Sequence, residues 1–189
     1  MSEEKKQHKI IVGGIGRTGS TALMCILSYL ELGTGFGKYS YRNEYINKLF
    51  FLEGREEAYI YKENENAGLI PERFDKYIVD YFIFLQRDIN KAAASRVRKH
   101  QEGYWMGGLT ADTEWKPERQ NAILLGKYKS LKRYLEKRDV PVVEIIYPDF
   151  IKDVDYLYEK LLLPFPCLEK DRLKKAFDLI IYKDTEGYK

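Results

Sequence analysis

The stretch from Lys9 to Thr21 constrains this chain more than any other. Its apolar, β-branched run from Ile10 to Val12 predicts a buried strand. A glycine-rich turn follows, and the apolar spacing over residues 20–31 predicts an amphipathic helix. Glycines let backbone N–H groups close around an anion, and the first N–H groups of a helix have no partners within it. Because the helix dipole also favours negative charge there, we predict a phosphate site.

The residues of this turn fit a phosphate but not an ATP-hydrolysing loop. The Walker A pattern G-x-x-x-x-G-K-[ST] can be placed on residues 14–21, yet Ser20 stands where the lysine belongs. That lysine is needed near the β- and γ-phosphates of ATP. The basic residue is instead an arginine, flanked by hydroxyl residues that can donate hydrogen bonds. The candidate binding residues are Gly14, Gly16, Arg17, Thr18, Gly19, Ser20 and Thr21. The alternative is a tight strand-to-helix turn that binds nothing.

Length and charge limit the number of domains and the kinds of partner that the chain can have. With 189 residues the chain suits one domain, 1–189, of which we expect 1–8 and 184–189 to be flexible. Its 32 basic and 29 acidic residues nearly cancel, which argues against a nucleic-acid partner. Its two cysteines, Cys25 and Cys167, match no metal-site spacing. Without a signal-like N-terminus or an apolar run of about 20 residues, we expect a soluble, cytoplasmic protein with no membrane span. The sequence leaves the oligomeric state open.

The remaining hydrophobic pattern predicts strands alternating with helices. Two further strands are predicted at 81–85 and 142–147, the first apolar throughout, as in parallel strands covered on both faces. The sequence assigns no elements between residues 38 and 67. The predicted helices beyond the first span 71–77, 90–101, 117–138, 151–163 and 168–180. This alternation predicts an α/β fold with a mostly parallel sheet flanked by helices.

A second anion signal follows the second predicted strand. Arg87 ends that strand, and Ser95 lies eight residues later in the next helix. Ligands of parallel α/β sheets collect outside the carboxyl ends of the strands. An arginine there can bind a phosphate through two parallel hydrogen bonds, and the serine adds a hydroxyl. The alternative is a solvated ion pair of Arg87 with Asp88 that caps the helix.

Taken together, these segments resemble the sulfotransferase family that uses 3′-phosphoadenosine-5′-phosphosulfate (PAPS). The order basic, hydroxyl, Gly, hydroxyl, hydroxyl over residues 17–21 resembles that family's 5′-phosphosulfate loop. Arg87 and Ser95 have the spacing of its 3′-phosphate signature, although Ile89 replaces the usual proline. Residues 142–150 resemble its strand followed by Tyr-Glu-Asp-Leu, with Pro148 for the glutamate and Phe150 for the leucine. The three segments occur in the family's order over about residues 9–165.

The resemblance implies a three-layer, P-loop-like α/β fold and a PAPS-dependent enzyme that needs no metal. A sulfuryl group would pass to a hydroxyl or amine of a small-molecule or carbohydrate acceptor, and adenosine 3′,5′-bisphosphate would remain. Arg17 would stabilise the bridging oxygen as the leaving phosphate gains charge. Residues 18–21 would hold the 5′-phosphate, and Arg87 with Ser95 the 3′-phosphate. The aromatic residues Tyr104, Trp105 and Trp115 could line the acceptor site, cover the nucleotide or belong to the core.

The general base is the least determined part of the predicted site. Family members use a histidine or glutamate between the first loop and the 3′-phosphate strand, but His8 and His100 both lie outside that interval. Glu44 is therefore the first candidate and Glu53 the second. Two other functions remain open: a nucleotide kinase-like phosphotransferase, disfavoured by the missing Walker lysine, and a non-catalytic nucleotide-binding protein of the same fold.

Overall fold

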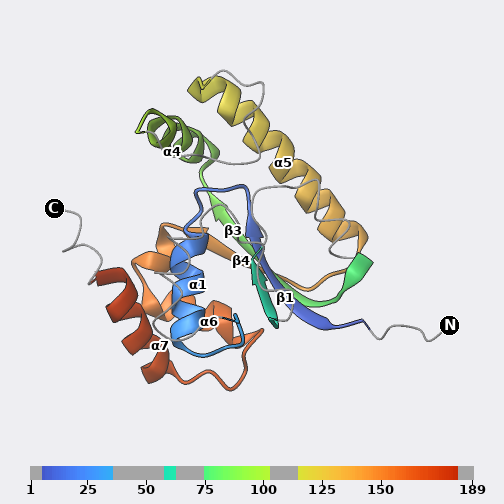
Figure 1. The fold of residues 1–189 in the computed structure, drawn as a ribbon, viewed down its shortest axis with the longest axis vertical. Coiled ribbons are helices and arrows are strands. Elements are labelled where there is room, and N and C mark those ends of the chain that lie inside the picture. Colours follow the sequence, from blue (N-terminus) through green and yellow to red (C-terminus); the bar gives the residue numbers. More distant parts are fainter. Residues whose placement is uncertain (1–5, 36–57, 63–74, 103–114, 183–189) are drawn as a thin grey trace.

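The protein is a three-layer α/β structure built on one parallel sheet (Figure 1). The computed structural model describes residues 6–35, 58–62, 75–102 and 115–182. Their four strands are β1 (His8–Gly14), β2 (Ile60–Lys62), β3 (Ile78–Arg87) and β4 (Val142–Tyr147). The strand order is β2-β1-β3-β4, and every neighbouring pair is parallel. The predicted fold class is therefore confirmed.

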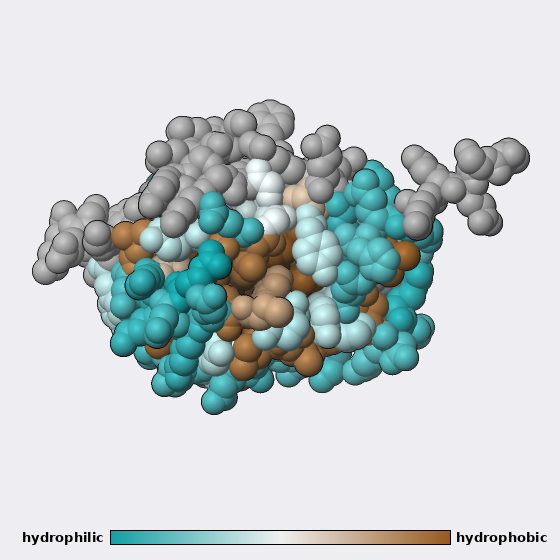
Figure 2. Space-filling view, turned by 90° about the horizontal axis from the view of Figure 1, so that it is seen from below, coloured by the Kyte–Doolittle hydropathy of each residue, from teal (hydrophilic) through white to brown (hydrophobic). Residues whose placement is uncertain are grey.

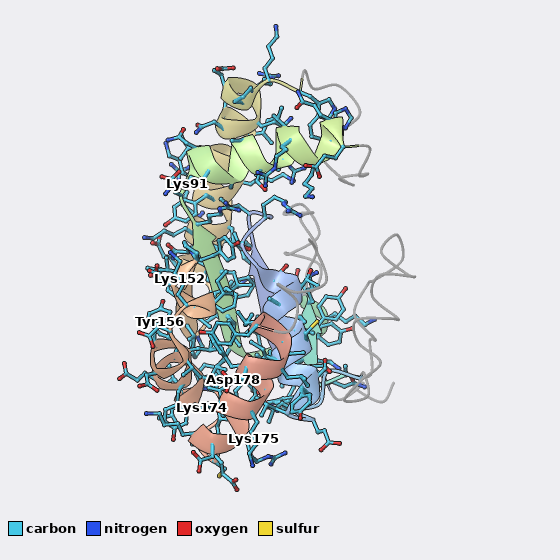
Figure 3. All side chains as sticks on the ribbon, turned by 90° about the vertical axis from the view of Figure 1, so that its left-hand side faces the viewer. Lys91, Lys152, Tyr156, Lys174, Lys175 and Asp178 are labelled. Atoms are coloured by element: carbon cyan, nitrogen blue, oxygen red, sulfur yellow. The ribbon has the colours of Figure 1, made fainter. Side chains whose placement is uncertain are left out.

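One face of the sheet is covered by α1 (Ser20–Tyr29), α6 (Val154–Leu162) and α7 (Lys170–Phe177). Because successive side chains of a strand point to opposite faces, alternate residues of β1, β3 and β4 enter this layer. Ile10, Ile83 and Ile145 are fully buried there, packed with leucines of all three helices. Figure 3 views the molecule from the side, with Lys152 and Tyr156 marking the region of α6, and Lys174, Lys175 and Asp178 the carboxyl end of α7.

The opposite face is covered by α4 (Ile89–Gln101) and α5 (Pro117–Lys137). Phe82 and Phe84 of β3 pack against Leu131 and Leu135 of α5. α4 lies against α5 through Ala92, Ala93 and Leu124, and Figure 3 shows Lys91 at the beginning of α4, above the sheet. Both faces of the sheet are thus covered, as the apolar strand at 81–85 predicted.

The element boundaries differ from the predictions in ways that local contacts explain. The predicted helix at 151–163 begins at residue 154, because the Asp153 carboxylate accepts hydrogen bonds from the backbone N–H groups of Asp155 and Tyr156 and so caps the helix. Residues 149–151 form a 3₁₀ turn instead. The predicted helix at 168–180 gives way at residue 178 to a π-helical turn. Most of the predicted helix at 71–77 lies outside the described residues.

Apolar side chains are also exposed on one end of the molecule. Figure 2, which views the molecule from below Figure 1, shows apolar residues gathered in the middle of this face between hydrophilic borders. This view is from the side away from the glycine turn that joins β1 to α1. Within the described residues, no helix has the length and apolar character needed to cross a membrane.

Candidate functional site

The strand order locates a candidate site between β1 and β3. From β1 the chain goes to β2 on one side of it, and then to β3 on the other side. In parallel α/β sheets such a reversal opens a crevice at the carboxyl ends of the two central strands, where ligands bind. The glycine turn follows β1 and Arg87 ends β3. The two predicted anion sites therefore come from the two strands that flank the reversal.

The glycine turn has the backbone geometry that its sequence predicted. Gly16 has φ 87°, and Gly19 has φ 78° as the N-cap residue of α1, so both occupy the left-handed region that favours glycine. A Cβ on Gly14 would lie 2.5 Å from the carbonyl oxygen of Leu85, so only glycine allows this approach of β1 to β3. No side chain of the described residues caps α1. The first N–H groups of α1 therefore keep their capacity to bind an anion.

The hydroxyl residues of the turn are not equivalent. Thr18 is buried, and its hydroxyl oxygen lies 3.1 Å from the position of a Cβ on Gly14. This hydroxyl therefore lies next to Gly14, where β1 ends and the turn begins. Ser20 and Thr21 are half-buried in the first turn of α1.

Arginine contacts join the glycine turn to β3 and α4. Arg17 has φ 55°, and its carbonyl oxygen accepts a hydrogen bond of 2.9 Å from Nη1 of Arg87. The Nε atom of Arg17 donates a hydrogen bond of 3.2 Å to the hydroxyl oxygen of Ser95, which is buried in α4. Arg17 of the glycine turn and the predicted pair Arg87 and Ser95 thus form one connected cluster.

Arg87 also has an aromatic neighbour that the site predictions did not include. Its guanidinium carbon lies 4.7 Å from the ring centroid of Tyr147, the last residue of β4. Within the described residues, the Nε atom of Arg87 is buried and has no hydrogen-bond partner. Burying a charged donor without an acceptor costs desolvation free energy. The unpaired Nε atom is therefore consistent with an anion binding at this cluster.

Asp88 has a different role from the predicted ion pair. Its side chain caps α4 by accepting a 2.8 Å hydrogen bond from the backbone N–H of Lys91. No ion pair between Arg87 and Asp88 occurs in the described part of the chain. The alternative interpretation is therefore correct about the cap and wrong about the pair, and the guanidinium of Arg87 is directed to the glycine turn.

Glu102, just after α4, is a carboxylate that interacts electrostatically with Arg17. Its pKa is lowered mainly by a hydrogen bond from Lys99, with smaller contributions from the charges of Arg98 and Arg17. A lowered pKa makes a carboxylate a weaker base, so Glu102 is a poor candidate for deprotonating an acceptor. The two predicted bases, Glu44 and Glu53, lie outside the described residues.

Other predictions for the site have mixed outcomes. Trp115 stacks on His100, with ring centroids 3.8 Å apart, whereas Tyr104 and Trp105 lie outside the described residues. In the described ranges, no group of three or more His, Cys, Asp or Glu side chains could hold a metal ion.

Compared with known proteins, the chain matches no protein-family model and no curated protein.

Proposed function

We propose that this chain is a sulfotransferase that moves a sulfuryl group from PAPS to a hydroxyl or amine acceptor. The observation that supports it best is the connected cluster of Arg17, Arg87 and Ser95 at the carboxyl ends of β1 and β3. A nucleotide with phosphates on both its 5′ and 3′ positions needs two neighbouring anion sites. ATP has no 3′-phosphate and would leave the second site without a ligand.

The residues present fit such a donor in number and chemistry. The uncapped N-terminus of α1, with backbone N–H groups of residues 18–21, suits the 5′-phosphate. Arg87, whose buried Nε atom has no partner among the described residues, and the hydroxyl of Ser95 suit the 3′-phosphate. Gly14 allows the close approach of β1 to β3, and Gly16 supplies a left-handed backbone conformation within the turn.

The chain's own residues would contribute charge and position rather than covalent chemistry. When bound, the donor supplies a sulfuryl group whose bond to the 5′-phosphate oxygen breaks as a bond to the acceptor oxygen or nitrogen forms. Arg17 would neutralise the negative charge that grows on that phosphate oxygen. The N-terminus of α1 would hold the phosphate in line with the acceptor, which removes much of the entropic cost of reaction. Adenosine 3′,5′-bisphosphate would be the product.

A base must accept the proton that the acceptor loses. We propose Glu44 for this role, with Glu53 as the second candidate, because both lie between the glycine turn and β3 in the sequence. Either glutamate needs a pKa raised by burial or by a neighbouring carboxylate to act near neutral pH. The proposed acceptor is a small molecule or carbohydrate, the proposed location is the cytoplasm, and no metal is required.

Transfer of radiolabelled sulfate tests this proposal. The protein is incubated with labelled PAPS and a panel of phenols, amines and sugars, and labelled products are separated by chromatography. We expect at least one sulfated product, and we expect Arg17→Ala to lower its rate at least about a hundredfold, as loss of a group that stabilises transition-state charge does. The matched control is Arg133→Ala, which removes an exposed arginine of α5 and should leave the rate unchanged.

Two results would contradict the proposal. One is magnesium-dependent transfer of phosphate from ATP with no transfer of sulfate. The other is a sulfate transfer rate that Arg17→Ala and Arg133→Ala leave equally intact.

A further inference from the structure

We propose that Tyr147 is a positioning residue for Arg87 and that it acts through its aromatic ring, not its hydroxyl. This inference rests on the proposed function, because it concerns how the chain would hold the arginine that binds a 3′-phosphate. Tyr147 would not need to touch the nucleotide. Its effect would be to fix the plane and direction of the guanidinium before the nucleotide arrives.

The sheet itself brings the two side chains together. Arg87 and Tyr147 are the last residues of β3 and β4, and they are register partners in this parallel pair. Register partners on neighbouring strands point to the same face of a sheet. Both side chains therefore lie on the face that carries α1, and the guanidinium carbon is 4.7 Å from the ring centroid.

The ring of Tyr147 also packs against α1 and against the turn after β4. A Cβ on Gly19 would lie 2.7 Å from Cδ2 of Tyr147 and 2.9 Å from Cζ of Phe150, so both rings pack directly on the N-cap of α1. Phe150 is fully buried and meets Tyr147 edge to face, with ring centroids 6.1 Å apart. The Tyr147 ring thus contacts both the N-cap of α1, at the predicted 5′-phosphate site, and the arginine of the predicted 3′-phosphate site.

Stacking suits this role because it leaves the donors of the arginine available. A guanidinium carries its five N–H donors in one plane and can place the face of that plane on an aromatic ring. The ring therefore restrains Arg87 without consuming a hydrogen bond. Within the described residues, one donor of Arg87 binds the carbonyl oxygen of Arg17 and the buried Nε has no partner. The remaining donors keep a direction set by the ring.

Calorimetric titration of Tyr147→Leu and Tyr147→Phe tests the inference. Each variant is titrated with adenosine 3′,5′-bisphosphate and with adenosine 5′-monophosphate, which lacks only the 3′-phosphate. We expect the leucine variant to bind the bisphosphate about tenfold more weakly, the effect of losing a partly desolvated cation–π contact, and the monophosphate within about twofold of wild type. The phenylalanine variant should match the wild type with both ligands. If Tyr147→Leu does not fold, Tyr147→Met takes its place in the same titrations.

A double-mutant cycle separates positioning from a merely structural role. In an Arg87→Ala background, Tyr147→Leu should cause no further loss of bisphosphate affinity, because the residue through which it acts is gone. Equal losses for both nucleotides, a loss in the phenylalanine variant, or an undiminished loss in the Arg87→Ala background would overturn the inference. Failure of the proposed function looks different: the wild-type protein itself would then show no preference for the bisphosphate over the monophosphate, and the inference would fall with it.

Discussion

Gly19 is the position where a single methyl group should disturb the site most. It is the N-cap of α1 with φ 78°, and a Cβ there would lie 2.7 Å from Tyr147 and 2.9 Å from Phe150. Real Cβ atoms essentially never approach other atoms so closely. Gly19→Ala therefore imposes both an unfavourable backbone conformation and a steric overlap with two aromatic rings.

The magnitude follows from these two terms. A non-glycine residue in the left-handed region costs roughly 1–2 kcal/mol. Inserting a methyl group into a packed region costs about 1–3 kcal/mol more, because the neighbouring side chains must leave their rotamers. We therefore expect Gly19→Ala to lower the free energy of unfolding by about 2–5 kcal/mol. The overlap also moves Tyr147, the neighbour of Arg87.

Two other glycines separate the contribution of the backbone conformation from that of the steric overlap. Gly33 has φ 76°, but among the described residues a Cβ there would meet only the Tyr59 Cβ, at an ordinary 3.4 Å. Gly33→Ala should therefore cost only the backbone term of about 1–2 kcal/mol. Gly126 lies inside α5, and a Cβ there would meet no atom of the described residues within 4 Å. Gly126→Ala should therefore stabilise the protein by about 0.5–1 kcal/mol through helix propensity.

Urea unfolding monitored by circular dichroism gives the three differences under one set of conditions. From most to least stable, we expect the order Gly126→Ala, wild type, Gly33→Ala, Gly19→Ala. If Gly19→Ala lowered the free energy of unfolding no more than Gly33→Ala, the steric contribution of the aromatic rings at the N-cap would be refuted.

Two further predictions concern a helix cap and an alkaline titration. Asp88→Ala should lower the free energy of unfolding by about 1 kcal/mol, because α4 loses its cap. Asp88→Asn should keep most of the stabilisation by the cap, since asparagine also accepts this hydrogen bond. Equal losses for both variants in urea unfolding would contradict this role of Asp88. Partial desolvation, with a hydrogen bond to Asp80, raises the pKa of the Tyr59 hydroxyl from 10.0 to about 12. The folded protein therefore holds this proton to higher pH than the unfolded chain does. The contribution of this proton to the free energy of unfolding is complete below pH 10 and is lost as the pH rises towards 12. Urea unfolding at several pH values should therefore show a smaller loss of unfolding free energy over that interval for Tyr59→Phe than for wild type.

The elements that the sequence predicted well are those with a strong local pattern. The strands at 81–85 and 142–147 and the helix that Pro117 opens carry long apolar runs or a clear helical repeat, and the structure contains all of them. β2 was not predicted, because Ile60–Lys62 is only three residues long and no alternation distinguishes it from its surroundings. Its place in the sheet depends on pairing with β1, which is a tertiary contact.

In the candidate site, too, features with a local sequence pattern could be predicted, and features that depend on tertiary contacts could not. The glycine turn and Arg87 could be found from spacing, since each motif lies at the end of a recognisable strand. Tyr147 could not be assigned a role from spacing, because its contact with Arg87 depends on the register between β3 and β4. The cap formed by Asp88 could be anticipated only as an alternative, since an aspartate before a helix can cap it or pair with a neighbouring arginine.

The central claim is that two anion sites at one edge of the sheet hold the two phosphates of a single nucleotide. Calorimetric titration of the wild-type protein and of Arg87→Gln with adenosine 3′,5′-bisphosphate, adenosine 5′-monophosphate and magnesium ATP tests it most directly. The claim predicts that the wild type binds the bisphosphate at least about tenfold more tightly than either other nucleotide, and that Arg87→Gln removes this preference. Binding of magnesium ATP without binding of the bisphosphate, or a preference that survives in Arg87→Gln, would contradict it.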